Sequence, residues 1–169
     1  MNRFKGAASL AFCIGVLAGC SKSASSTADT SAAATVASAP TDAASDDQAV
    51  RSASQAWFTA YNGRALDTLV GLYADDATLN IPGHTPFQGS AAIREAYTKD
   101  LADATKGGLS MNAGSDPKFS VSGDMASEWN TFTMTDKSGK AVAAGKYITV
   151  FMRKDGKWVI AHDIWNLDT

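Results

Sequence analysis

Residues 142–166 read VAAGKYITVFMRKDGKWVIAHDIWN, and this stretch decides the fold. Two runs in it, Val142–Arg153 and Lys157–Asn166, alternate between apolar and polar residues with the period of two that is typical of strands. They are separated by Lys154-Asp155-Gly156, and Asp-Gly between alternating runs is a hairpin signal. This stretch therefore predicts two long antiparallel strands joined by a tight turn.

Three more alternating runs precede this hairpin, so most of the C-terminal half is predicted to be antiparallel strand. They cover Leu109–Ala113, Lys118–Ser122 and Met125–Thr135.

Helical patterns precede the strands. The first helix is predicted to open with Ser45 as N-cap and Gln48 three residues later, a capping box, and to stop at Gly63. A second helix is predicted over residues 65–73 and a third over residues 89–107, where apolar residues recur at helical spacing.

A short strand, Ala77–Ile81, is predicted between the second and third helices. Helices followed by a curled meander give an α+β domain. A strongly bent antiparallel sheet wrapped around a long helix leaves a cavity at one end, which is where we expect a ligand site.

The N-terminus has the layout of a secretory signal, because two cations, Arg3 and Lys5, precede an apolar run that is too short to span a membrane. The run ends in Leu17-Ala18-Gly19-Cys20, which resembles the lipobox of bacterial lipoproteins. The alternative is an ordinary signal with a chance cysteine. The resemblance implies a signal peptide over residues 1–19 and a lipid anchor on Cys20.

After the anchor, residues 20–44 consist mainly of Ala, Ser, Thr and Asp without an aromatic residue, which predicts a disordered tether. Residues 45–169 then form one pocket domain. By analogy with lipoproteins, Ser21 after the cysteine indicates the outer membrane, with the domain facing the periplasm.

Composition excludes several classes of partner. The formal net charge is −2 and no basic run is present, which argues against nucleic acid. The two cysteines lack metal-site spacing. A metal site built from His84, His162 and Asp163 would need both histidines to face one point, and the alternation of side chains along the last strand opposes this. No cofactor is expected.

Two groups of segments carry a family resemblance. Residues 72–79 (LYADDATL) and 87–94 (FQGSAAIR), with the closing motifs at 145–150 (GKYITV), 155–158 (DGKW) and 162–166 (HDIWN), resemble the nuclear transport factor 2-like superfamily. Within it, the ketosteroid isomerases and SnoaL-like proteins are the most similar. The resemblance implies a cone-shaped, curved antiparallel sheet packed on three N-terminal helices, an apolar pocket, and commonly a homodimer through the outer sheet face.

The chemistry of a ketosteroid isomerase does not carry over. Its carboxylate base falls at Ile81, its tyrosine at Trp57, and its protonated aspartate near Ile148. Isoleucine cannot exchange a proton, and an indole N–H donates a hydrogen bond but cannot accept one. The same isomerisation by the same groups is therefore not expected.

One carboxylate is expected in the pocket. The family's strand parity points Ala161, Asp163 and Trp165 into the cone and points Ile160, His162 and Ile164 to the outer face. Asp163 could then act as an acid or base. Alternatively, it could order the site by bonding to a backbone amide, to Trp57 or to Asn130.

Further candidates surround that acid. His84, in a loop at the expected pocket mouth, is a possible proton carrier, although a loop histidine is more often solvated. Trp158 and Phe151 are candidates for the outer face, where they would favour a dimer. The candidates for ligand binding are mostly aromatic: Trp57, Tyr61, Tyr73, Ile81, Tyr97, Trp129, Ile148 and Trp165.

Two functions remain open at this stage. The first is a pocket protein that binds a small apolar molecule or a partner. The second is a SnoaL-like isomerase, hydrolase or dehydratase that uses Asp163, with His84 or Tyr97 as a helper.

Overall fold

The computed structural model describes residues 43–168. The predicted signal peptide, Cys20 and nearly all of the predicted tether lie outside these residues. No helix within residues 43–168 has both the length and the apolar character needed to cross a bilayer.

The described residues contain three helices: α1 (Ala43–Asn62), α2 (Leu66–Val70) and α3 (Gly89–Gly107). The prediction for α3 is confirmed, and Gly108 ends it in the left-handed conformation that a helix C-terminus favours. The predicted start of α1 is wrong, because Ser45 lies inside the helix. Two alanines precede Ser45, and alanine is the strongest helix former.

The second helix is shorter than predicted. It stops at Val70 because Gly71 follows, and Tyr73 already belongs to a strand. Tyr73 was predicted to lie on the inner face of that helix. It belongs to a strand instead, but it is still buried in the core.

Within residues 43–168, seven strands form one sheet: β1 (Tyr73–Asn80), β2 (Phe87–Gln88), β3 (Ser110–Ala113), β4 (Lys118–Ser122), β5 (Met125–Thr135), β6 (Ala141–Lys154) and β7 (Lys157–Leu167). Their order is β2-β1-β7-β6-β5-β3, and β4 also pairs with β5. The predicted closing hairpin is confirmed. Its two-residue turn places Asp155 at φ 51° and Gly156 at φ 75°, as a primed turn requires.

The sheet is mixed rather than wholly antiparallel. β1 and β7 run parallel, whereas every other pair is antiparallel. Parallel neighbours need a long connection, and here α3 and four strands of the meander lie between β1 and β7 in the chain. A predicted meander, in which each strand pairs with the next one in sequence, could not include this pairing.

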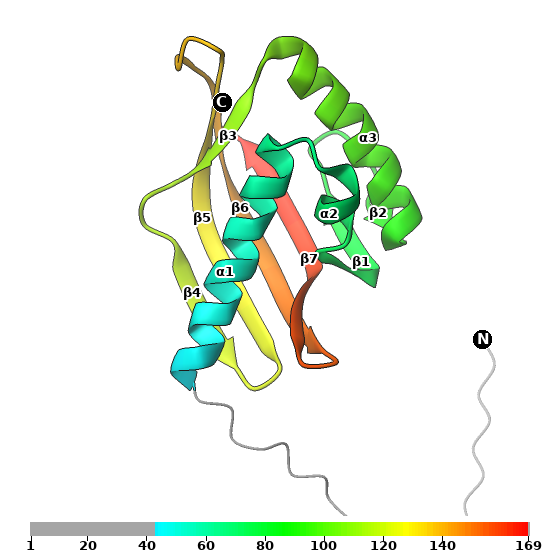
Figure 1. Cartoon of the computed structure of the whole chain (residues 1–169), viewed down its shortest axis with the longest axis vertical. Coiled ribbons are helices and arrows are strands. Elements are labelled where there is room, and N and C mark those ends of the chain that lie inside the picture. Colours follow the sequence, from blue (N-terminus) through cyan, green and yellow to red (C-terminus); the bar gives the residue numbers. More distant parts are fainter. Residues whose placement is uncertain (1–42, 169) are drawn as a thin grey trace, which may run out of the picture. The chain divides into compact units, whose positions relative to one another are not determined.

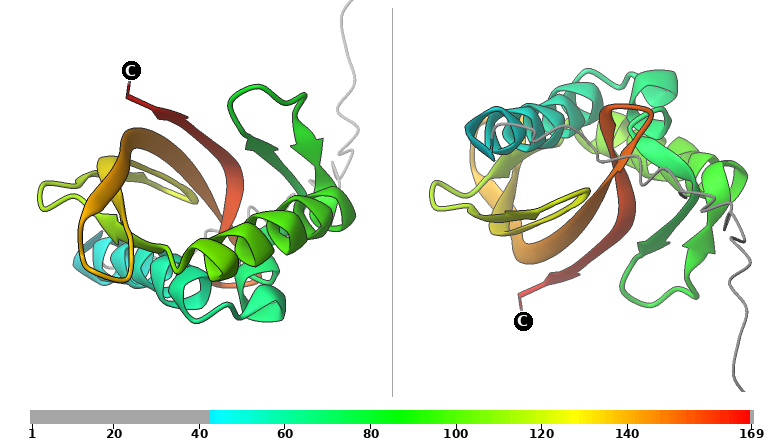
Figure 2. Two further views of the ribbon diagram at one scale, coloured as in Figure 1. Left: turned by 90° about the horizontal axis from the view of Figure 1, so that it is seen from above. Right: turned by 90° about the horizontal axis from the view of Figure 1, so that it is seen from below.

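The sheet curls strongly, and α1 and α3 close its open side (Figures 1 and 2). α3 packs on β1 and β2, while α1 packs against β3, β4 and β7. The core between them is apolar, and its largest fully buried side chains are Tyr61, Phe151, Leu69, Leu79, Ile93 and Val50.

A bulge in β7 sets which side chains face this core. Val150 pairs with His162 but Phe151 pairs with Ile160, so Ala161 is an extra residue in the strand. Ile160 and Asp163 therefore both point inward. The predicted outward direction of Ile160 is wrong because the bulge shifts the alternation by one residue.

The same shift accounts for Trp158, which is buried rather than on the outer face. Phe151 is buried as well, because the residues of β6 that face inward are Tyr147, Thr149 and Phe151.

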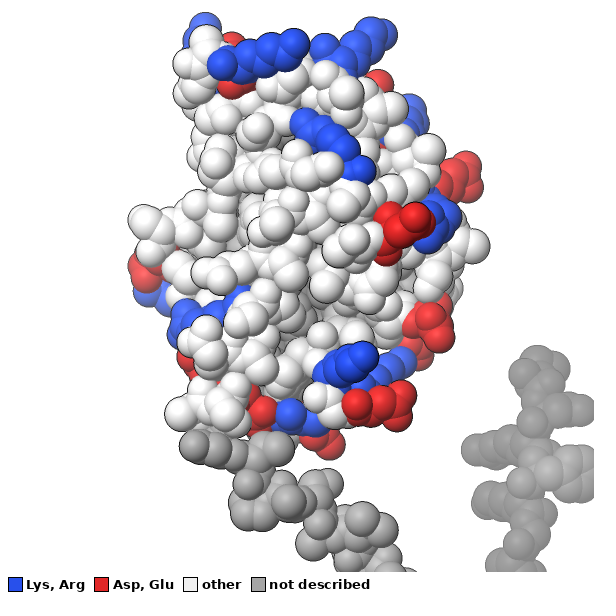
Figure 3. Space-filling view, in the orientation of Figure 1, with Lys and Arg blue, Asp and Glu red and all other residues white. Residues whose placement is uncertain are grey.

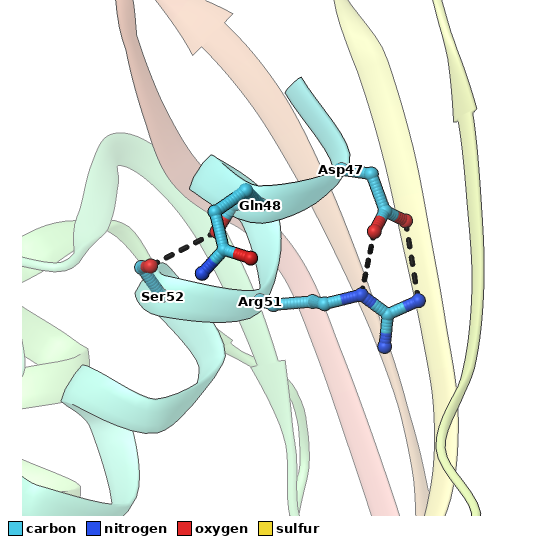
Figure 4. Close-up of polar contacts among 4 residues, drawn as sticks. All are labelled: Asp47, Gln48, Arg51 and Ser52. Atoms are coloured by element: carbon cyan, nitrogen blue, oxygen red, sulfur yellow. Dashed lines mark hydrogen bonds and ion pairs between the residues drawn. The ribbon is translucent and has the colours of Figure 1, made fainter. Parts of the chain in front are cut away.

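The first turn of α1 is attached to the sheet by a shielded ion pair. Asp46 Oδ2 lies 2.6 Å from Arg153 Nη2, and the Asp46 side chain is 8% exposed. Arg153 also packs over the Trp158 ring at 4.4 Å. The neighbouring Asp47 faces away and pairs with Arg51 one turn along the helix at 2.6 Å, with both side chains about two-fifths exposed (Figure 4).

Charged side chains of both signs lie mainly along the edges of the face shown in Figure 3, and most of its middle is uncharged. This face therefore carries no patch of a single sign.

Candidate functional site

A partly enclosed cavity lies between the helices and the inner face of the sheet. The centre of a water-sized sphere can move through about 60 Å³ of it. Eight aromatic side chains line it: Trp57, Phe58, Tyr61, Tyr97, Phe132, Tyr147, Phe151 and Trp165. The rest of the lining is Ser54, Ile81, Asp100, Met111, Glu128, Met134, Thr149, Ile160 and Asp163.

The structure places five of the eight predicted ligand-binding residues in this lining: Trp57, Tyr61, Ile81, Tyr97 and Trp165. Tyr73 is buried but not part of the lining. Trp129 and Ile148 were placed on the wrong face, since both are nearly half exposed. Their neighbours in β5 and β6 take the inward positions, because side chains alternate along a strand.

Asp163 lies in the lining and is 5% exposed. Its Oδ2 accepts a hydrogen bond of 2.7 Å from the Tyr73 hydroxyl, and its Oδ1 accepts one of 3.2 Å from Thr149 Oγ1. The Tyr73 hydroxyl lies 2.6 Å from the Tyr97 hydroxyl and accepts a hydrogen bond of 2.9 Å from Trp57 Nε1. A phenol has one proton and two lone pairs, so Tyr73 uses all three when Tyr97 donates to it.

These contacts set the proton affinity of Asp163. Burial raises its pKa from 3.8 to about 6, although the hydrogen bonds from Tyr73 and Thr149 act in the opposite direction. Burial and the nearby carboxylate of Asp163 raise the pKa of both Tyr73 and Tyr97 well above the usual value. Near neutral pH the network therefore holds a carboxyl group that can change its charge beside two neutral phenols.

The partners of Asp163 differ from most of those considered in the sequence analysis. The Trp57 indole reaches it only through Tyr73, and Asn130 bonds instead to the carbonyl of Gly114. Of the predicted partners only a backbone amide, that of Ile164, acts on the Asp163 carboxylate.

The two histidines lie outside the cavity. His84 is exposed in the loop before β2, where its ring packs against Phe87 with 5.7 Å between the ring centroids. His84 is not part of the lining, but its backbone amide donates a hydrogen bond of 3.1 Å to the carbonyl of Ile81, which is part of it. His162 is exposed on the outer face, as predicted.

Sequence reasoning missed a second buried carboxylate, Glu128, which is 2% exposed. It accepts a hydrogen bond of 2.6 Å from the Tyr147 hydroxyl. Glu128 pairs in register with Thr149, and Thr149 with Asp163, so the three form one inward row across β5, β6 and β7. The signal was the alternation of β5, in which Ala126, Glu128, Asn130 and Phe132 share a face.

A third acid, Asp100, enters the lining from α3. Burial raises its pKa, and the Tyr61 hydroxyl, Arg64 and Lys99 act against that rise. It also helps to raise the pKa of the Tyr61 hydroxyl, which is buried and has no hydrogen bond of ordinary geometry among the described residues. Within residues 43–168, no group of three His, Cys, Asp or Glu side chains is arranged to hold a metal ion.

The model of the SnoaL-like domain matches residues 42–162, which is well over half of the chain. The chain belongs to the SnoaL-like family. Solved structures agree with this assignment at the level of the fold.

Three similar structures come from bacteria. An NTF2-like protein with a cystatin-like fold from Novosphingobium aromaticivorans has a TM-score of 0.67 at 17% identity, over 73% of this chain and 82% of its own. An NTF2-like protein of unknown function from Pseudomonas putida has a TM-score of 0.66 at 17% identity, over 73% and 87%. A protein of unknown function from Nostoc punctiforme has a TM-score of 0.65 at 12% identity, over 74% and 92%.

This SnoaL-like domain therefore has the α+β, nuclear transport factor 2-like fold that the sequence predicted. Fold alone does not give function. The chemistry available here is that of two buried carboxylates in one row, each held by a phenol, in a cavity with aromatic walls.

Proposed function

We propose that this SnoaL-like domain binds a small, mostly apolar molecule in the cavity between its helices and its sheet. The observation that carries the proposal is the lining, in which eight aromatic rings surround a few convergent polar groups. Aromatic walls with a small number of oriented polar groups are typical of sites for small molecules. Rings provide contact area, and the polar row on the sheet fixes the orientation of the ligand.

The size of the cavity limits the ligand. One water needs roughly 10–15 Å³ by the measure that gives about 60 Å³ here. With the side chains as they stand, the cavity suits a molecule of one ring or a few heavy atoms. A larger ligand would require the half-exposed rings at the rim, such as Trp165, to move.

Fragment binding followed by nuclear magnetic resonance tests the proposal. A library of single-ring compounds should shift the signals of residues in the lining, and native mass spectrometry should detect co-purified molecules. Trp57→Ala should abolish both effects, because it removes the ring that stacks on Tyr61 at 5.2 Å. Trp129→Ala, on the outer face, is the matched control and should leave binding unchanged. Absence of binding by the whole library would contradict the proposal.

A second candidate function is favoured by the hydrogen-bond network. Asp163, with a pKa of about 6, could accept a proton from a bound ligand and return it at another position, as an isomerase, hydrolase or dehydratase requires. Tyr97 lines the cavity and donates its proton to Tyr73, so its role would be to hold Tyr73 as the donor to Asp163.

Turnover assays on cyclic ketones, epoxides and hydroxy compounds test this second function. Asp163→Asn should abolish turnover while retaining binding of the same compound, and Tyr97→Phe should reduce turnover less. Full turnover in Asp163→Asn would remove Asp163 from the mechanism.

We further propose that a lipid on Cys20 holds this domain at the periplasmic face of the outer membrane. The support is the sequence Leu17-Ala18-Gly19-Cys20 after an apolar run.

A further inference from the structure

The cavity is unbalanced in charge. Three carboxylates, those of Asp100, Glu128 and Asp163, belong to its lining, and the lining contains no Lys, Arg or His. Asp100 is partly compensated from outside by Arg64 and Lys99. Glu128 and Asp163 are the more deeply buried pair, at 2% and 5% exposure.

The hydrogen bonds found for these two acids come from neutral groups. Tyr147 donates to Glu128, and Tyr73 and Thr149 donate to Asp163. Neither acid takes part in an ion pair with a described residue. An ionised carboxylate without a counter-charge is costly in an apolar interior, and it either keeps a proton or gains a cationic partner.

The Arg51 guanidinium does not fill that role. Arg51 acts on Glu128 electrostatically, but its guanidinium is held by Asp47 at 2.6 Å and lies 4.3 Å from the centre of the Phe119 ring. Its side chain is about two-fifths exposed and does not belong to the lining. No described cation therefore neutralises Glu128 and Asp163 within the cavity, and a cationic ligand in the cavity could do so.

The remaining walls also suit a cation. Aromatic faces attract ammonium groups through the ring quadrupole, and several rings around one site form the cage that recognises organic ammonium ligands. The Tyr61 hydroxyl, on a residue that is 1% exposed, has no hydrogen bond of ordinary geometry among the described residues, and beside Asp100 it offers an acceptor for an N–H in the same cavity.

We propose that the ligand of this cavity is an organic cation, namely a protonated amine or quaternary ammonium group carried by a small apolar body. The charged group meets the row of Glu128, Thr149 and Asp163, and the apolar body packs among the rings. This inference rests on the proposed small-molecule function and names the chemical class of its ligand.

Three probes that share one ring and differ in charge test the inference: benzylamine, benzyl alcohol and benzoate. Dissociation constants are measured by nuclear magnetic resonance titration of the folded domain at pH 7.5, where benzylamine is a cation. We expect benzylamine to bind at least tenfold more tightly than benzyl alcohol, and benzoate to be excluded. Glu128→Gln should weaken benzylamine about tenfold and leave benzyl alcohol unchanged, because an amide keeps the Tyr147 hydrogen bond and removes only the charge.

The outcomes distinguish failure of the cation inference from failure of the proposed small-molecule function. If benzyl alcohol binds as tightly as benzylamine, or if benzoate binds best, the cavity takes small molecules but the inference is overturned. If none of the probes binds, the proposed function fails and the inference fails with it. If Glu128→Gln unfolds, as circular dichroism would show, Asp163→Asn replaces it, and unchanged benzylamine affinity in a folded variant overturns the inference.

Discussion

The hydroxyl of Tyr73 donates a hydrogen bond of 2.7 Å to the carboxylate of Asp163, although 90 residues separate them in the chain. Tyr73 opens β1 and Asp163 lies in β7, the strand that runs parallel to it. The parallel pairing therefore assembles the polar centre of the cavity as well as the sheet.

Removing that hydroxyl should affect both stability and protonation. We expect Tyr73→Phe to lower the free energy of unfolding by about 1–3 kcal/mol, because Trp57 Nε1 and Asp163 lose a buried partner. It should also raise the pKa of Asp163, since the lost bond favoured the ionised form. Urea denaturation and a carbon-13 titration of the carboxyl group measure the two effects.

Tyr61→Phe is the matched control for Tyr73→Phe. It removes a hydroxyl that is equally buried but has no hydrogen bond of ordinary geometry. The free energy of unfolding should therefore fall much less than in Tyr73→Phe. Equal losses in the two variants would mean that the network around Tyr73 contributes nothing.

Stability should depend on pH through Asp163. Its pKa is 3.8 as a free group and about 6 when folded, so between these values the folded state holds a proton that the unfolded state has lost. Stability from this group is therefore highest at low pH, falls as pH rises through that window, and is level above about pH 6. Two pKa units correspond to roughly 3 kcal/mol.

The measurement compares the unfolding free energies of the wild type and Asp163→Asn across this range. The fall in stability as pH rises toward 6 should be present in the wild type and absent in Asp163→Asn. Asp116→Asn, at an exposed carboxyl, should keep it. A fall that persists in Asp163→Asn would assign the titration to another group.

The two neighbouring aspartates at the start of α1 should differ in their effect on stability. Asp46 is shielded and faces Arg153 on the sheet, whereas Asp47 pairs with Arg51 on the same helix in a half-exposed position. Asp46→Asn should lower the melting temperature by several degrees, because it leaves Arg153 facing a neutral amide at its shielded contact. Asp47→Asn should change it little. Similar shifts in both variants would contradict an anchoring role for Asp46.

An exposed apolar row on the outer face is the place to test the predicted homodimer. Trp129, Ile148 and Ile164 pair in register across β5, β6 and β7, and each is about half exposed. If two copies meet there, Trp129→Ser should weaken the dimer at least tenfold in sedimentation equilibrium. Val142→Ser, at an equally exposed residue outside the row, should not. A monomeric wild type would refute the prediction.

Lipidation is tested on the full chain in a bacterial host. We expect the wild type to incorporate labelled palmitate and to sediment with membranes, and Cys20→Ala to do neither. Cys13→Ala, within the predicted signal peptide, is the control and should behave like the wild type. Labelling of Cys20→Ala would exclude the anchor.

Sequence reasoning identified the elements whose signals are local. β4 and β5 match their predicted bounds, and α3 and the Asp155-Gly156 turn follow from glycine positions and periodicity. What it missed depends on contacts between distant residues. The β1–β7 pairing, the partner Tyr73 for Asp163 and the bulge at Ala161 leave no local pattern, and the bulge alone reversed the expected direction of Ile160 and Trp158.

The candidate site was missed in part for the same reason. Ile148 was placed inward by carrying positions over from a resemblance, and Trp129 because large rings usually pack inside. Both lie one residue away from the true inward set, and a shift of one residue in a strand turns every side chain over. Glu128 was hidden by that error because it lies next to Trp129. Asp163 was found because its inward direction did not depend on the bulge.

β7 is the last of the described strands in sequence, yet it is an inner strand of the sheet, since it lies between β1 and β6. The residues that join the two halves of the sheet are therefore synthesised after all the other described strands. Until residues 157–167 emerge, β1 and β6 each have an unpaired edge, and the nascent chain cannot complete its core. A stop codon in place of Lys157 should therefore give an aggregation-prone, protease-sensitive product instead of a slightly smaller domain.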